Sequence, residues 1–207
     1  MKVGVLALQG DVPEHLAAAG GLGGTVRAVR APADLATVDA LFLPGGESTT
    51  IARLLRESGL WEPLARRIAD GLPVLATCAG LILLARQLET SPSGPNPPTL
   101  GVLDVRVRRN DYGSQRESFE AAVDVVGVGG PPFPGVFIRA PRILEVGPGA
   151  TVLARRGPEV VGVSQGRLWG LTFHPELSGD LRLHERFLAT AAAPRRGRPA
   201  PSAADAQ

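Results

Sequence analysis

The chain contains a single cysteine, Cys78, and its setting is typical of an enzymatic nucleophile. Residues 73–77 before it form an apolar run of strand length, and residues 81–85 after it read as the apolar start of a helix. A nucleophile between a strand and a helix stands on a sharp turn at the carboxyl edge of a sheet. The following helix N-terminus favours a thiolate and offers N–H groups to an oxyanion. A lone cysteine is more often a small buried apolar side chain, so the interpretation depends on this strand–turn–helix setting.

A histidine and a carboxylate follow nearly a hundred residues later. His174 and Glu176 come directly after residues 168–173, another run typical of a strand. One cysteine, one histidine and a nearby carboxylate are the makeup of an activated-thiol hydrolase. A His-x-Glu pair also occurs in zinc deaminases, but these need further cysteines, so the sequence predicts no metal site. A simple strand-ending turn is the alternative for this segment.

A third candidate segment is Pro-Gly-Gly-Glu-Ser-Thr-Thr at residues 44–50. It follows a strand-like run at 41–43 and precedes a helical pattern. Paired glycines at such a point allow the backbone to approach a ligand closely. A glycine turn with a Ser or Thr helix cap is the alternative. A phosphate-binding loop is disfavoured because that motif needs a lysine, and Lys2 is the only lysine in the chain.

Composition limits the possible partners. Three arginines and one aspartate in residues 194–207 account for the whole formal net charge of +2, so the remaining body is balanced. Aromatic residues make up only 4% of the chain, which leaves few platforms for base stacking and disfavours a nucleic-acid partner. We find no apolar run of about 18 residues that would span a membrane. The amino terminus reads as a first strand without a basic leader, and a single cysteine excludes an internal disulfide, so we expect a cytoplasmic protein.

The elements predict an α/β fold with three layers: a mostly parallel central sheet flanked by helices, and antiparallel strands in the second half. Those strands either continue the same sheet or form a small accessory one. Residues 1–193 are expected to form one domain, and the Pro/Ala/Arg tail at 194–207 to be disordered. Asp11 and Glu14 resemble a capping box that opens the first helix. Expected strands are 3–8, 25–29, 40–43, 73–76, 101–107, 119–126, 136–138, 151–154, 160–164 and 168–173; expected helices are 11–19, 49–58, 61–70, 81–88 and 181–192, with an exposed loop at 91–98.

These segments together resemble the class I (triad) glutamine amidotransferases. More narrowly, they look like the glutaminase subunits of pyridoxal 5′-phosphate synthase. The resemblance runs from about residue 2 to residue 192. It is carried by Leu8-Gln9-Gly10, residues 44–50, Thr77-Cys78-Ala79-Gly80, Arg109-Asn110, Gly-Val-Phe-Ile-Arg-Ala-Pro at 135–141 and Phe-His-Pro-Glu-Leu at 173–177.

The resemblance implies a mechanism in which Cys78 attacks the side-chain amide of L-glutamine and forms a γ-glutamyl thioester. His174 would take the thiol proton and deliver one to the leaving ammonia, and Glu176 would orient His174. The N–H groups of Gly46 and Ala79 would form the oxyanion hole. Water would then release glutamate. No cofactor is implied.

The resemblance also implies substrate contacts and a partner. Gly46, Glu47, Ser48, Arg109, Ile138 and Arg139 would contact glutamine, and the segment Gln9-Gly10 would rearrange on activation. The ammonia would pass to a separate synthase subunit in a hetero-oligomer, which would combine it with a pentose phosphate and a triose phosphate. The alternatives are a glutaminase for a different synthase, a γ-glutamyl hydrolase, and a non-catalytic binding protein on the same fold.

Overall fold

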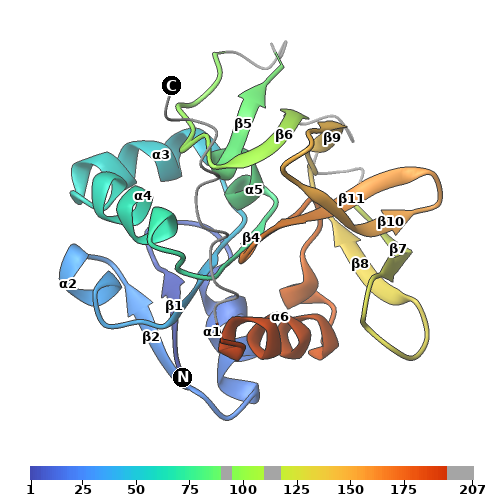
Figure 1. Cartoon of the computed structure of the whole chain (residues 1–207), viewed down its shortest axis with the longest axis horizontal. Coiled ribbons are helices and arrows are strands. Elements are labelled where there is room, and N and C mark those ends of the chain that lie inside the picture. Colours follow the sequence, from blue (N-terminus) through green and yellow to red (C-terminus); the bar gives the residue numbers. More distant parts are fainter. Residues whose placement is uncertain (90–94, 110–117, 195–207) are drawn as a thin grey trace, which may run out of the picture.

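The fold is built on a nine-stranded sheet, seen in a computed structural model that describes residues 1–89, 95–109 and 118–194 (Figure 1). The strand order is β2-β1-β3-β4-β12-β11-β10-β7-β8. The strands are β1 (Lys2–Leu6), β2 (Thr25–Val29), β3 (Ala40–Leu43), β4 (Val74–Thr77), β7 (Phe119–Val125), β8 (Phe133–Phe137), β10 (Thr151–Arg156), β11 (Glu159–Gln165) and β12 (Leu168–Leu171).

One half of this sheet is parallel and comes mainly from the first part of the chain. β2, β1, β3, β4 and β12 pair in parallel, which confirms the sheet expected from the alternating strands and helices. In the register, Leu171 of β12 lies beside Thr77 of β4. The carboxyl ends of these two strands therefore meet at one edge of the sheet, where Cys78 and His174 follow them.

The second half of the chain contributes antiparallel strands in both of the arrangements that the sequence left open. β11, β10, β7 and β8 continue the same sheet as antiparallel neighbours. A separate three-stranded sheet has the order β5-β6-β9, in which β6 pairs with β5 in parallel and with β9 antiparallel. Its strands are β5 (Ala85–Leu88), β6 (Leu103–Arg108) and β9 (Arg142–Val146).

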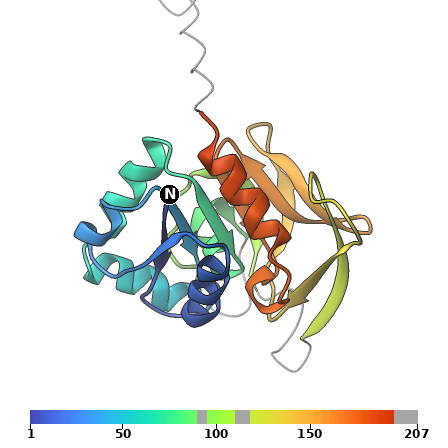
Figure 2. The same cartoon turned by 90° about the horizontal axis from the view of Figure 1, so that it is seen from below.

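Helices cover both faces of the large sheet, which gives three layers (Figure 2). Buried side chains alternate along β3: Leu41 and Leu43 join one core cluster, while Phe42 joins the other. The first cluster lies under α3 (Ser48–Glu57), α4 (Trp61–Ala69) and α5 (Ala79–Leu84), and the second under α1 (Val12–Gly21) and α6 (Arg182–Ala192). The described residues also include two short helical turns, α2 (Pro32–Leu35) and η2 (Pro175–Leu177).

The predicted helix at 81–88 is wrong in its second half, because α5 ends at Leu84 and β5 begins at Ala85. The carbonyls of Leu83 and Leu84 accept hydrogen bonds from the N–H groups of Leu100 and Val102, at 2.7 and 3.0 Å, so they do not continue the helix. Residues 81–85 are all buried, and a short run that is apolar on every side suits a strand as well as a helix. Pairing with β6 decides between the two.

Two further expectations need correction or lie beyond the described residues. Asp11 precedes α1, but its side chain makes no capping hydrogen bond there, so the predicted capping box is wrong.

The strand β9 was not predicted at all. Residues 91–94 of the expected 91–98 loop, Asn110 and the tail from 195 onward lie outside the described residues. Among the residues that are described, no helix is both long and apolar enough to cross a membrane.

Candidate active site

Cys78 occupies a strained turn between β4 and α5. Its φ of 47° lies in the left-handed region, which costs a non-glycine residue about 1–3 kcal/mol and persists only where the surroundings enforce it. Here the Cys78 N–H donates to Leu171 O of β12 at 2.8 Å, and Cys78 O accepts from Ile82 of α5 at 3.3 Å. A Cβ at Gly80 would lie 2.3 Å from Leu43 O, so only glycine lets α5 start this close to β3. The turn places Cys78 where the sequence predicted it.

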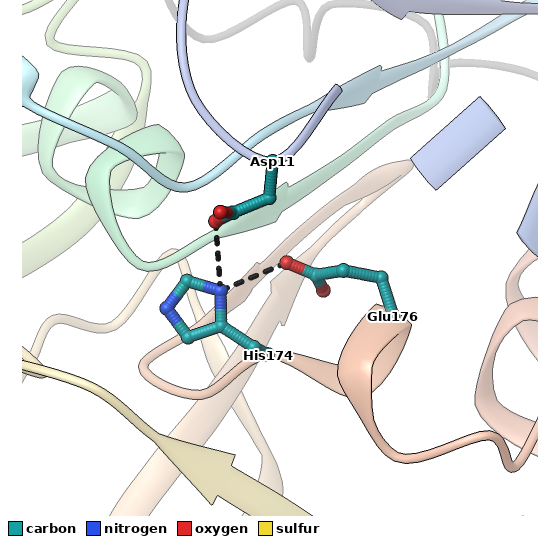
Figure 3. A group of neighbouring side chains, drawn as sticks. All are labelled: Asp11, His174 and Glu176. Atoms are coloured by element: carbon teal, nitrogen blue, oxygen red, sulfur yellow. Dashed lines mark hydrogen bonds and ion pairs between the residues drawn. The ribbon is translucent and has the colours of Figure 1, made fainter. Parts of the chain in front are cut away.

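His174 and Glu176 stand at the same edge, just beyond β12. Figure 3 shows the Glu176 carboxylate pointing toward the imidazole. The His174 backbone N–H donates to Val136 O at 2.8 Å, which ties this segment to β8. The Nδ1–H of His174 donates to Glu176 Oε1 at 2.8 Å, and the Cys78 side chain lies close enough to the imidazole to raise its pKa. The three residues of the predicted triad are therefore brought together. Since Nδ1 faces the carboxylate, Nε2 is the nitrogen available to the thiol.

The electrostatics of this group favour a charged imidazole. Burial opposes the charged form, but hydrogen bonds with Asp11, Cys78 and Glu176 raise the pKa of His174 well above its ordinary value. Burial likewise opposes the ionised form of Glu176, yet the neighbouring His15 and His174 hold the pKa of that carboxyl far below its usual range. The site thus contains a buried anion next to an imidazole that readily holds a proton.

The segment at 44–50 lies against this group. A Cβ at Gly45 would be 2.4 Å from His174 Cε1 and 2.8 Å from Asp11 Oδ2, so glycine is needed for the imidazole to fit. The cap of α3 is Glu47, whose carboxylate accepts from the N–H groups of Thr49 at 3.2 Å and Thr50 at 2.7 Å. Burial raises the pKa of Glu47, but these hydrogen bonds and the positive charge of Arg109 outweigh it and hold that pKa below its usual value.

The segment Gln9-Gly10 packs directly on this loop. Gln9 Oε1 accepts the Glu47 N–H at 2.8 Å, and a Cβ at Gly10, whose φ is +104°, would lie 1.7 Å from Gly45 O. Gly45 O also accepts the Asp11 N–H at 3.2 Å. Because the peptide is trans, the Gly46 N–H points away from Gly45 O. The Ala79 N–H belongs to the first turn of α5, where helix N–H groups have no intrahelical acceptor.

Of the other predicted contact residues, Ile138 lies against the thiol and Arg109 lies against Glu47. Arg109 is buried, with Nη2 3.5 Å from Glu47 Oε1 and Nη1 donating to Pro95 O at 3.1 Å. The carbonyl oxygen of Ile138 lies 3.9 Å from Cys78 Sγ. Arg139 follows it with a φ of 45°. Ser48 is buried as the first residue of α3.

Two residues that the sequence did not assign to the site also converge on it. Asp11 Oδ2 lies 3.2 Å from His174 Nδ1 (Figure 3), and His15 Nε2 lies 3.3 Å from Glu176 Oε1. The four-residue spacing of Asp11 and His15 at the start of α1 was the available signal, because such residues share one helix face.

The set of Asp11, His174 and Glu176 also has the makeup of a cation site, with ligand atoms within 4.8 Å of one another. A metal on Nδ1 would have to replace the proton that His174 donates to the carboxylates. The hydrogen-bonded arrangement therefore competes directly with a metal.

An α/β sheet that carries a strained cysteine turn, with a histidine and a buried carboxylate beyond the adjacent strand, defines a class of thiol-dependent hydrolases and amidotransferases. The model of the SNO glutamine amidotransferase family matches residues 5–192. The chain belongs to the SNO glutamine amidotransferase family.

Relatives and solved structures agree with this family. The chain is 53% identical over 186 residues to a pyridoxal 5′-phosphate synthase subunit PdxT of Streptomyces avermitilis, covering 90% of this chain and 92% of the relative. It is 53% identical over 192 residues to the PdxT of Deinococcus radiodurans, covering 92% of this chain and 97% of the relative. A crystal structure of a glutamine amidotransferase superposes with a TM-score of 0.84 at 46% identity, over 92% of this chain and 99% of that one. A putative GMP synthase protein from Thermoplasma acidophilum shares the fold, with a TM-score of 0.66 at 17% identity, over 93% and 94%.

Proposed function

We propose that this chain is the glutaminase subunit of a pyridoxal 5′-phosphate synthase, and that it hydrolyses L-glutamine to glutamate and ammonia. Membership of the SNO glutamine amidotransferase family makes it a glutamine amidotransferase. Relatives at about half identity over most of the chain carry the name of the synthase subunit. The observation that carries the proposed chemistry is the contact of His174 with both Cys78 and the buried Glu176.

In the proposed reaction, His174 Nε2 takes the proton of the Cys78 thiol, and Sγ attacks the side-chain amide carbon of glutamine. The oxyanion that forms is stabilised by the N–H groups of Gly46 and Ala79. His174 then donates its proton to the amide nitrogen, ammonia leaves, and the γ-glutamyl group remains as a thioester on Sγ. Water, deprotonated by His174, adds to the thioester, and glutamate departs as Sγ leaves. Glu176 keeps Nδ1 protonated and oriented throughout.

Substrate recognition is proposed for the residues around the thiol. Arg109 and Arg139 bear the positive charges suited to the α-carboxylate of glutamine. Glu47, Ser48 and the Ile138 backbone supply polar groups for its amino group and side chain. The proposed functional unit is residues 1–193, as a single domain in the cytoplasm. Transfer within a complex suits the product, because ammonia is largely protonated in water at neutral pH and is then no longer a nucleophile.

The test is an assay of glutamine hydrolysis by the full chain, alone and with a co-expressed synthase subunit of the same source. We expect release of glutamate and ammonia, and a loss on the order of 10⁶ in kcat for Cys78→Ala with an unchanged circular dichroism spectrum. An electrophilic glutamine analogue should add one mass equivalent at Cys78. A Cys78→Ala variant that keeps a tenth of the activity would contradict the mechanism. Faster turnover of longer γ-glutamyl compounds than of glutamine would favour a γ-glutamyl hydrolase.

A further inference from the structure

A second imidazole, that of His15, lies near the same carboxylate oxygen of Glu176 that accepts from His174. His15 belongs to α1 and is fully buried, and the Glu176 side chain is also 0% exposed. His15 Nε2 lies 3.3 Å from Glu176 Oε1 and 3.0 Å from Thr77 Oγ1. Thr77 is the residue directly before Cys78, at the end of β4. One ring nitrogen therefore contacts the candidate carboxylate and the strand that carries the candidate nucleophile.

The partners of the ring determine its tautomer. An ionised carboxylate can only accept, so Nε2 must carry a proton to make a favourable contact with Glu176. If Nε2 were unprotonated, its lone pair would face Oε1 at this distance and repel it. Within the described residues, His15 Nδ1 has no hydrogen-bond partner, which suits an unprotonated nitrogen better than a buried N–H. The arrangement thus selects a neutral ring with its proton on Nε2, pointing at Glu176 and Thr77.

Glu176 depends on such a second donor. It sits on η2, a turn of only three residues, and its Oε2 has no partner within the described part of the chain. With His174 as its only donor, the buried carboxylate would be held by a single hydrogen bond and could still rotate around it. A second donor to Oε1, from α1, removes that freedom.

We propose that His15 is a positioning residue for glutamine hydrolysis: its Nε2–H holds the Glu176 carboxylate in place for His174 and fixes it relative to Thr77 and the nucleophile turn. The proposal rests on the proposed glutaminase function. In this role His15 needs no contact with substrate. Its effect reaches the reaction only through Glu176, so it should act on kcat and not on glutamine binding.

The chain provides a matched control in His184 of α6. Its ring is as buried as that of His15, and their centroids are 6.2 Å apart. Among the described residues, neither nitrogen of His184 has a hydrogen-bond partner. Both histidines also pack against Phe42, with centroid distances of 5.7 and 5.5 Å. The two therefore share burial and neighbours, and differ in that a nitrogen of His15 lies 3.3 Å from Glu176 Oε1.

The experiment compares His15→Gln with His15→Met, in the full chain together with its synthase subunit. Glutamine places an N–H donor near the position of Nε2, whereas methionine has the same length and no donor. We expect His15→Met to lower kcat at least tenfold with KM within twofold of wild type, and His15→Gln to keep most of the activity. His184→Met should leave kcat unchanged. Equal kcat for His15→Gln and His15→Met, or an equal loss in His184→Met, would overturn the proposal.

A double-mutant cycle gives a second, independent readout. In the Glu176→Gln background, His15→Met should cause no further loss of kcat, since the group it positions is already altered. Two full, additive losses would overturn the proposal. If His15→Met does not fold, His15→Asn replaces it, because the shorter amide reaches only the position of Nδ1.

Alkylation of Cys78 by iodoacetamide separates this proposal from the glutaminase assignment. Wild-type chain that reacts rapidly but hydrolyses no glutamine would contradict the proposed function alone. In that case slower alkylation of His15→Met than of His15→Gln still supports the role of His15, and equal rates overturn it.

Discussion

The Asp11 carboxylate lies 3.2 Å from Nδ1 of His174, the same nitrogen that donates to Glu176 at 2.8 Å. Two carboxylates thus share one imidazole N–H, and Asp11 is the more exposed of the two. Asp11 also donates its backbone N–H to Gly45 O, at the loop proposed to bind the oxyanion. The protonation of His174 is therefore coupled to the conformation of the segment that carries Asp11.

The first prediction follows from that shared proton. The anionic Asp11 raises the pKa of His174, so Asp11→Asn should lower that pKa, by about one unit for a removed neighbouring charge. The chain has only three histidines, so the imidazole nitrogens of ¹⁵N-histidine-labelled protein can be titrated and assigned individually by NMR. His174 should lose its proton at lower pH in the variant. Asp34→Asn, which removes a carboxylate bound to Arg27, is the control and should leave His174 unchanged.

The second prediction concerns Gly10. A Cβ there would lie 1.7 Å from Gly45 O, so Gly10→Ala must displace the segment or the loop it contacts. We expect glutamine hydrolysis in the complex to fall by about 10²–10³, the typical effect of losing one oxyanion donor. Gly23→Ala is the matched control: its φ of +72° is also in the region that L side chains rarely adopt, but no atom lies within 4 Å of the added Cβ. Similar activity in the two variants would show that the close approach at Gly10 does not matter for the reaction.

The third prediction is activation by the partner. Gln9 and Gly10 contact the glycine loop through one side-chain hydrogen bond and one close backbone approach, and glycine allows a peptide to reorient at little steric cost. We expect the synthase subunit to raise kcat by up to about 10³ while changing KM less. Steady-state kinetics of the chain alone and in the complex measure this. An isolated chain as fast as the complex would exclude such gating while leaving the triad assignment intact.

The fourth prediction is the effect of His184 on acid stability. Burial is the main cause that lowers the pKa of His184, to about 4 from its usual value of 6.5. The unfolded chain therefore binds this proton more readily than the folded chain. The contribution of the neutral His184 to the free energy of unfolding is fully present above pH 6.5 and is lost as the pH falls toward 4. The full effect is on the order of 3 kcal/mol. Denaturant unfolding of wild type and His184→Leu across this range should show a difference that shifts in favour of the variant as the pH falls. A constant difference would contradict the linkage.

The parts of the site that follow strand ends were predictable, while those that depend on packing were not. In a parallel sheet, residues after neighbouring strands meet at one edge, so Cys78 and His174 converge whatever the details of the loops. The roles of His15 and Asp11 depend on how α1 packs across that edge, which no local pattern encodes. Asp11 resembles a helix cap in the sequence because a carboxylate before a helix usually caps it, yet here it contacts His174.

The same distinction explains the errors in the fold. Residues 81–88 begin as a helix, as expected, but their second half is drawn into pairing with β6, a tertiary contact that outweighs local preference. Strand β9 was missed because Arg142 and Glu145 interrupt a short apolar run. The long amphipathic helices α3 and α4 were predicted within a residue or so of their ends, since their apolar faces are fixed by the chain alone.

The pairing of Leu168 with Val74 has a consequence for biosynthesis. During translation, the cysteine turn emerges with β4 long before β12 and the histidine that follows it have been made. Until β12 inserts beside β4, Cys78 lacks both the Leu171 carbonyl that accepts its N–H and the imidazole proposed to activate its sulfur. A nascent or prematurely terminated chain therefore carries the thiol without its reactivity, and the ability to consume glutamine arises only when nearly all of the polypeptide has left the ribosome.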